Sequence, residues 1–358
     1  MPFSELIAQD RALGALRAAL RKGTLHHAYL FAGPPGVGKG RAARLLAQAA
    51  NCEGGAPAAS PAAYREDPCG ACGPCRKIAR GNHPDVVELA EERVMAKAGR
   101  WEPKSGRSPS RDIVVDQIRD VVDHRLALKR YEGRRRFVVI DPADAMNLQA
   151  QNALLKTLEE PPPDTTLVLV AGSADALLPT IRSRCLRVAF GPIPDDQVVA
   201  RLVAEGRSEA EARLAVALAA GSLGRALALD PEELAALRES VRAAAALDPD
   251  DALGWLAFAR THGEDRERAG ELCELLAVWL RDVLAAQAGA GALAGTGMLA
   301  LWELAPETRR LAAALSPAEV VHRRAEVTRT AAALLQNASP VLAIERLLLG
   351  WFHGRPQA

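Results

Sequence analysis

The residues with the clearest chemistry lie in a glycine-rich loop near the N-terminus. The run Gly-Pro-Pro-Gly-Val-Gly-Lys occupies positions 33–39, between an apolar segment at 29–32 and a helical pattern that starts at Arg41. When a loop with the spacing G-x-x-x-x-G-K joins a strand to a helix, its backbone N–H groups and the helix dipole surround a phosphate, and its lysine adds a positive charge. The sequence therefore predicts a phosphate-binding loop. Its residues are Gly33, Gly36, Gly38 and Lys39.

The metal ligands expected beside such a loop are only partly present. Gly40 stands where the pattern has a Ser or Thr whose hydroxyl ligates Mg²⁺. The apolar run 136–140 ends at Asp141, as a central parallel strand does when it brings a carboxylate to Mg²⁺. The alternative is a strand that ends in a turn-favouring residue before Pro142. We place Gly40 and Asp141 in the nucleotide site and leave open whether ATP with Mg²⁺ binds there.

A second group of residues suits a metal ion. Cys69, Cys72 and Cys75 are each separated by two residues, and Cys52 offers a fourth thiol. Four thiolates hold a structural zinc ion in a closed tetrahedral site. The alternatives are three reduced thiols in a loop, or a redox pair. We favour Zn²⁺.

The composition is that of a globular protein with more than one domain. A chain of 358 residues, 49% of them hydrophobic, is too long for one ordinary domain. Its formal net charge of +1 gives no support to non-specific nucleic-acid binding by the whole molecule. The N-terminus does not resemble a leader, and no apolar run approaches the ~18 residues that a membrane span needs. We expect a cytoplasmic protein without membrane contact.

The order of apolar segments predicts the fold. Strand-like runs alternate with helical patterns, which is typical of a parallel sheet covered on both faces. The predicted strands lie at 29–32, 86–89, 136–140, 166–171 and 186–190. A helix with one buried stripe is predicted at 112–126. From 231 onward the chain shows no strand-like alternation, so this part is predicted to be all-α.

The segment 93–111 is basic and contains Trp101. Its cations and its aromatic ring could contact nucleic acid or a partner. Because it is also rich in Gly, Ser and Pro, we favour a solvated loop.

Four motifs, taken in order, resemble those of a known family. They are the loop at 33–39, the cysteine cluster at 69–75, Asn-Ala-Leu-Leu-Lys-Thr-Leu-Glu-Glu-Pro at 152–161 and Ser-Arg-Cys at 183–185. Together they are similar to the bacterial DNA polymerase III clamp-loader subunits of the AAA+ class. The resemblance implies a nucleotide-binding core, a small helical lid and a helical collar through which subunits form a ring. The implied ranges are 1–190 for the core, with its zinc module near 52–80, 191–235 for the lid and 236–358 for the collar.

The resemblance also implies a task and partners. The family opens the sliding clamp and places it on primer-template DNA for the replicative polymerase, so the implied partners are the gamma/tau and delta subunits, the clamp and the DNA. Its motor branch, gamma and tau, keeps the loop Ser or Thr and an Asp-Glu pair. This chain has Gly40 and Asp141-Pro142 instead, so it resembles the delta prime branch, and hydrolysis in its own site is expected to be absent.

The same resemblance assigns roles to two arginines. Arg184 corresponds to an arginine finger that stabilises the phosphoryl transferred in a neighbouring subunit. The alternative for Arg184 is an ion pair with a surface acid. Arg225 corresponds to the sensor arginine of the lid.

Two other functions stay open at this point. The first is an ATP-hydrolysing, gamma/tau-like motor that uses an unusual Mg²⁺ ligand and base. The second is an unrelated P-loop kinase or nucleotide-binding switch, which would leave the cysteine cluster and the Ser-Arg-Cys motif unexplained.

Overall fold

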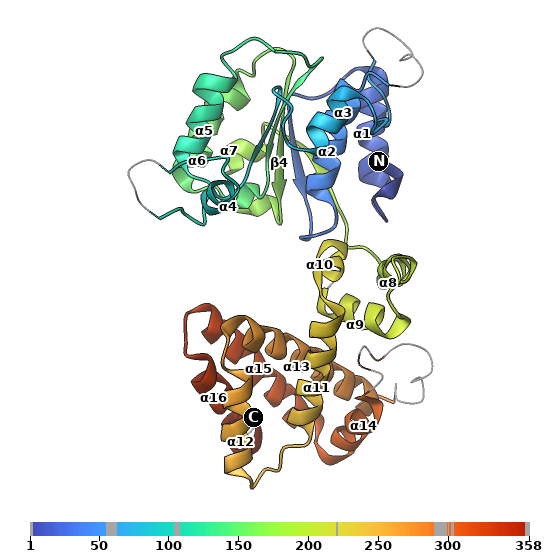
Figure 1. Cartoon of the computed structure of the whole chain (residues 1–358), viewed down its shortest axis with the longest axis vertical. Coiled ribbons are helices and arrows are strands. Elements are labelled where there is room, and N and C mark those ends of the chain that lie inside the picture. The colour runs from blue at the N-terminus through green and yellow to red at the C-terminus, as the bar shows by residue number, and fades with distance from the viewer. Residues whose placement is uncertain are drawn as a thin grey trace. The chain divides into compact units, whose positions relative to one another are not determined.

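The computed structural model divides the chain into two compact units, Met1–Gln197 and Val198–Ala358 (Figure 1). The residues described are 3–54, 63–103, 108–219, 221–289, 299, 301 and 304–354. The finer division into a core at 1–190, a lid at 191–235 and a collar at 236–358 stays a prediction.

The first unit is built on a sheet of five parallel strands, in the order β2-β3-β4-β1-β5. The strands are β1 (Ala28–Ala32), β2 (Val86–Leu89), β3 (Arg136–Ile140), β4 (Thr165–Ala171) and β5 (Leu186–Ala189). All residues of β1, β3 and β4 are buried, as expected for central parallel strands covered on both faces. At the β5 edge only Val188 is buried. The predicted parallel sheet is confirmed.

Helices cover both faces of this sheet, with α1, α2 and α3 on one side and α4 to α7 on the other (Figure 1). Their bounds are η1 (Phe3–Glu5), α1 (Asp10–Lys22), α2 (Lys39–Asn51), α3 (Gly73–Ala79), α4 (Glu92–Lys97), α5 (Val115–Arg119), η3 (Asp120–Arg125), η4 (Ala143–Ala145), α6 (Leu148–Glu159), η5 (Ala174–Ala176) and α7 (Pro179–Arg182).

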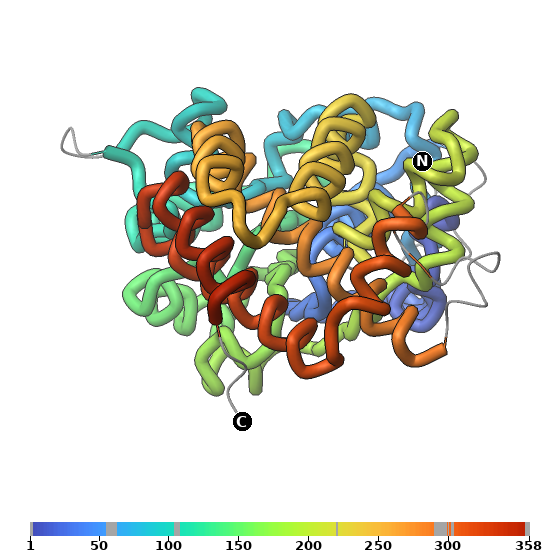
Figure 2. Tube along the Cα trace, turned by 90° about the horizontal axis from the view of Figure 1, so that it is seen from below, coloured from blue at the N-terminus to red at the C-terminus, as the bar shows by residue number. Residues whose placement is uncertain are grey.

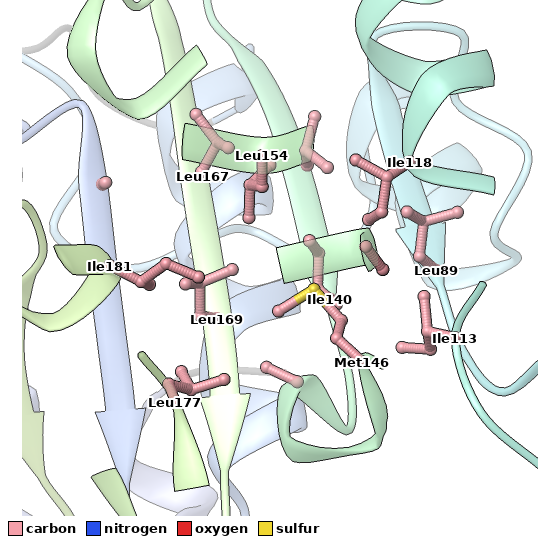
Figure 3. Close-up of a cluster of buried hydrophobic side chains, with 14 of the residues drawn as sticks. Leu89, Ile113, Ile118, Ile140, Met146, Leu154, Leu167, Leu169, Leu177 and Ile181 are labelled. Atoms are coloured by element: carbon pink, nitrogen blue, oxygen red, sulfur yellow. The ribbon is translucent and has the colours of Figure 1, made fainter. Parts of the chain in front are cut away.

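The largest core lies between the sheet and the helices of one face. Figure 3 shows Ile140 and Leu169 of the strands facing Leu154 of α6 and Ile118 of α5. Because α6 carries Ala150, Leu154 and Leu158 at helical spacing, one face of it is buried in this core. This packing holds rigid the ends of the strands from which the site residues extend.

The segment between β2 and β3 contains the predicted helix and Trp101. The helix expected at 112–126 is a short α5 followed by the π-helical turn η3, so the apolar stripe marked the buried side but not the helix type. Trp101 packs against the core, and its indole N–H donates to Glu92 (3.2 Å). A ring held in this way is an anchor for the segment and not a free stacking surface. Residues 104–107 lie outside the described part.

Among its described residues, the second unit contains helices and no β-strand, which confirms the all-α prediction. Its helices are α8 (Asp195–Ala204, which begins in the first unit), α9 (Glu209–Ala219), α10 (Leu223–Ala228), α11 (Pro231–Ala245), α12 (Ala252–His262), α13 (Arg266–Gln287), α14 (Ala305–Ala314), α15 (Pro317–Leu335) and α16 (Pro340–His353). Figure 2 shows α15 and α16 as adjacent red tubes, and α13 packs on α15. Among the described residues, no helix combines the length and apolarity that crossing a membrane requires.

Candidate functional site

The phosphate-binding loop follows β1 at the carboxyl edge of the sheet, where the sequence placed it. Gly33 comes directly after the strand, and α2 begins at Lys39. Gly38 has a φ of 96°, and a Cβ there would lie 2.6 Å from Cδ2 of Leu6. Only glycine combines that left-handed backbone with so close an approach. This backbone is compatible with the predicted phosphate cradle of Gly33, Gly36, Gly38 and Lys39, which stays a prediction.

The Lys39 side chain lies inside this loop. Its ammonium group donates to the carbonyl oxygens of Gly33 (2.7 Å) and Pro34 (2.5 Å). Only 6% of the residue is exposed. Burial lowers the pKa of Lys39, although Asp141 and Asp144 act in the opposite direction. The positive charge that a phosphate would meet is thus present, and it is held by the loop's own carbonyl groups.

Asp141 takes the space beside α2 that a larger residue at position 40 would need. A Cβ on Gly40 would lie 2.1 Å from Oδ2 of Asp141, so a Ser or Thr there would require the carboxylate to turn away. Burial raises the pKa of Asp141, and this outweighs the nearby Arg44 and Lys39, which lower it. The end of β3 and the loop therefore lie close together, but the Asp141 carboxylate occupies the space that a hydroxyl-bearing side chain at position 40 would need.

The neighbourhood of Asp141 includes a carboxylate that the sequence did not single out. Asp144 lies three residues further on, and its Oδ2 accepts a hydrogen bond from the backbone N–H of Gly172 (2.9 Å). This bond ties the end of β4 to the turn after β3. No sequence signal distinguishes Asp144 from other turn acids, because its partner is far away along the chain.

Arg184 lies at the amino ends of the parallel strands, whereas the loop lies at their carboxyl ends. It precedes the N-terminal end of β5, next to His27 at the start of β1, whereas the loop follows the far end of β1. The guanidinium forms an ion pair with Glu159 (2.7 Å) and donates to the carbonyl of Thr180 (3.0 Å). About a third of the side chain, 35%, is exposed. The structure thus shows the ion pair that was the alternative for this residue, on a side chain that solvent still reaches.

An open pocket of about 540 Å³ surrounds this arginine. It is lined by His26, His27, Leu158, Glu159, Ser183, Arg184, Cys185 and Leu186. The ring centroids of the two histidines lie 4.3 Å apart. Burial lowers the pKa of His27, with His26 acting in the same direction. Sequence reasoning missed this pair of histidines and Glu159.

The four cysteines of the cluster come together as predicted. Their sulfur atoms all lie within 4.8 Å of one another, and those of Cys52 and Cys72 are 3.9 Å apart. Zinc–sulfur bonds of about 2.3 Å in a tetrahedron place the sulfurs about 3.8 Å apart, so this donor set fits a zinc ion. Cys52 follows α2, and Cys75 lies in α3, where Gln48 of α2 donates to its carbonyl (2.8 Å). The cluster thus brings together the two ends of the segment from Cys52 to Cys75.

The environments of these thiols differ. Backbone N–H groups of Ala71 and Cys72 lower the pKa of Cys69 to about 6. Burial raises the pKa of Cys52 and of Cys75. Cys69 is exposed, whereas Cys52 and Cys75 are buried. The cluster therefore lies at the surface with its inner thiols covered.

The sequence of the first unit matches the model of a known family. Residues 8–194, more than half of the chain, match the family described as DNA polymerase III, delta subunit. The chain belongs to this family.

Similar proteins carry names from the same polymerase. A DNA polymerase III subunit delta' from Pseudomonas aeruginosa is 41% identical over 168 residues, 47% of this chain and 44% of that protein. The tau subunit from Escherichia coli is 34% identical over 275 residues, 73% of this chain and 39% of that protein. The delta' subunit from Bacillus subtilis is 33% identical over 207 residues, 58% of this chain and 54% of that protein. The matches thus span about half the length of these relatives or less.

Solved structures of related proteins align over most of the chain at low similarity. A DNA polymerase III gamma subunit-related protein from Thermotoga maritima covers 95% of this chain and 98% of that one, with 18% identity and a TM-score of 0.38. A likeness at this level adds nothing to the family assignment.

In this DNA polymerase III delta-family chain, Arg225 belongs to the second unit, whereas the other predicted site residues belong to the first. It lies in α10 of the second unit, and its guanidinium pairs with Glu274 of α13. Ser222 accepts a hydrogen bond from the backbone N–H of Arg225 (3.1 Å) and so caps the helix. Within its own unit, Arg225 therefore links two helices. Its role as a sensor arginine stays a prediction.

Proposed function

We propose that this chain is a delta prime-like, stationary subunit of the DNA polymerase III clamp loader. In this proposal it joins gamma/tau and delta subunits in a cytoplasmic hetero-oligomer that loads the sliding clamp on primer-template DNA. Family membership and the delta' names of two similar proteins support the assignment. It contributes to hydrolysis in a neighbouring subunit and performs none in its own site.

The observation that carries the proposal is the arrangement at position 40. There is no hydroxyl, Asp141 fills the space where one would be attached, and Pro142 follows Asp141 where a general base would be needed. Mg²⁺ can keep waters in place of a missing ligand, but water is not activated without a base. Lys39 and the loop backbone still suit a phosphate, so nucleotide binding without turnover is compatible with this site.

Arg184 is the residue that we propose to act in the neighbour. It is partly exposed, lies in an open pocket and sits at the sheet edge away from its own loop. A guanidinium in such a place can reach a phosphate that another subunit holds, and fingers of this kind are worth about 10³–10⁵ in rate. The ATP and Mg²⁺ on which it acts would belong to the neighbour.

The cysteine cluster is proposed to bind a structural zinc ion. All four ligand positions are supplied by the chain, so no position is left for a substrate. When bound, the metal would hold the inserted segment to α2.

The test compares ATP hydrolysis by the isolated chain and by the assembled complex. We expect negligible turnover by the isolated chain, and a loss of about 10³-fold or more at the site served by Arg184 in the complex with Arg184→Ala. Arg182→Ala is the matched control, because Arg182 pairs with Asp175 outside the pocket lining. Turnover by the isolated chain at motor-like rates, or full activity of the complex with Arg184→Ala, would overturn the proposal.

A further inference from the structure

The pocket around Arg184 contains a carboxylate where an anion would be expected to bind. Among its lining residues, Arg184 and Glu159 are the ones with fixed charges, and their charges cancel. Burial lowers the pKa of His27, and the ring of His26 lies 4.3 Å from that of His27. The pocket is thus polar, and the positive charge of Arg184 is already balanced by the negative charge of Glu159.

Glu159 occupies a position that is unfavourable for a carboxylate. It is the last residue of α6, and Glu160 follows it. The C-terminal end of a helix carries partial negative charge, so acids there are destabilising and cations are favoured. The ion pair with Arg184 offsets this, since the guanidinium lies 2.7 Å from Oε1 of Glu159. The helix end and the carboxylate both attract the same arginine.

The backbone of Arg184 is held independently of its guanidinium, because its N–H donates to the carbonyl of Ile181 (3.1 Å). The guanidinium can therefore exchange partners without movement of the main chain. A phosphate that enters the pocket offers stronger, bidentate acceptors for the guanidinium than a single carboxylate oxygen.

We propose that Glu159 is a positioning residue that competes with phosphate for Arg184. In the isolated chain the carboxylate holds the guanidinium at the end of α6, and an arriving polyphosphate displaces it. This inference rests on the proposed role of Arg184 and adds to it a built-in competitor. Because the pair is about one-third to one-half exposed, at 35% and 51%, the competition is modest in size.

The experiment titrates the isolated full-length chain with inorganic tripolyphosphate at constant ionic strength and pH 7.5. Binding is followed by the imidazole NMR signals of His26 and His27, which line the pocket and lie at the end of β1 away from the phosphate-binding loop. With Glu159→Gln we expect the midpoint to fall about two- to fivefold, the range for loss of an exposed ion pair.

Glu160→Gln is the matched control, because it removes the same charge from the next residue, which has no ion pair among the described residues. We expect it to titrate like the wild type, and we expect Arg184→Ala to abolish the response. A wild-type midpoint for Glu159→Gln would overturn the inference. So would an equal gain from Glu160→Gln, or a response that survives Arg184→Ala.

The titration tests the competition between Glu159 and phosphate independently of the proposed function. The isolated chain has no neighbouring subunit, so the result does not depend on hydrolysis. If the complex hydrolyses ATP normally with Arg184→Ala, the trans role is wrong, whereas the competition between Glu159 and an anion is still decided by the titration midpoints.

Discussion

At the scale of single residues, Asp85 binds a set of consecutive backbone N–H groups in the first unit. The residue is 2% exposed, and its carboxylate accepts hydrogen bonds from the backbone N–H groups of Tyr131 (2.9 Å), Glu132 (2.9 Å) and Gly133 (2.7 Å). Successive N–H groups that converge in this way form a pocket for an anion. Asp85 thereby fixes the turn that precedes β3, the strand that ends at Asp141.

We predict that Asp85→Asn lowers the free energy of unfolding of the first unit by about 1–3 kcal/mol. The amide keeps the size of the side chain but loses the charge, and its NH₂ group faces N–H donors. Hydrogen exchange of the β3 and β4 amides measures the effect. Asp112→Asn is the control, since Asp112 is exposed and has no described side-chain contact. A variant with unchanged exchange would show that the turn does not depend on Asp85.

The same residue predicts a dependence on pH. Burial raises the pKa of Asp85, but the N–H groups of Gly133, Glu132 and Tyr131 outweigh it, and the net pKa is lowered. A group with a lowered folded pKa stabilises fully above its unfolded value of about 3.9 and loses that contribution as the pH falls through the folded pKa. The difference between wild type and Asp85→Asn should therefore be constant above about pH 5 and shrink below about pH 4.

At the scale of elements, the short helix α3 contributes Cys75 to the cysteine cluster. It has seven residues, Gly73–Ala79, which is too short to be stable alone in water. Cys75 and Ile78 form its buried side, and Cys72 precedes it. We infer that the cysteine cluster, together with packing against α2, holds this helix in place.

We predict that the purified chain contains about one zinc ion and that Cys75→Ala loses it. The α3 amides should then exchange with solvent much faster, while those of β1 and β4 change little. Cys273→Ala is the control, because Cys273 is a buried core residue of α13 in the second unit. Full zinc content in Cys75→Ala, or loss of zinc in Cys273→Ala, would contradict the assignment of the ligands.

For the whole chain, the division into two compact units has an experimental consequence. The sheet, the cysteine cluster and the core of Figure 3 all belong to Met1–Gln197. We predict that a fragment of residues 1–197 folds by itself, unfolds cooperatively in urea and keeps its zinc. A fragment that binds the dye ANS and shows no cooperative transition would mean that the first unit depends on the second.

Much of this protein could be predicted from local patterns in the sequence. Strands such as β1 and β3 could be predicted because a central parallel strand is buried on both faces and therefore appears in the sequence as a continuous apolar run. The phosphate-binding loop and the spacing of Cys69, Cys72 and Cys75 were equally visible, because both chemistries need their residues close together in the chain.

What only the tertiary structure decided are the contacts between residues far apart in the sequence. That Asp141 fills the space beside Gly40 and that Glu159 holds Arg184 both follow from how helices and strands pack. A sequence pattern indicates which face of a helix or strand is apolar. It does not indicate which two polar side chains come into contact when these elements pack together. For that physical reason the types of the site residues were predictable, and the partners that set their charge and position were not.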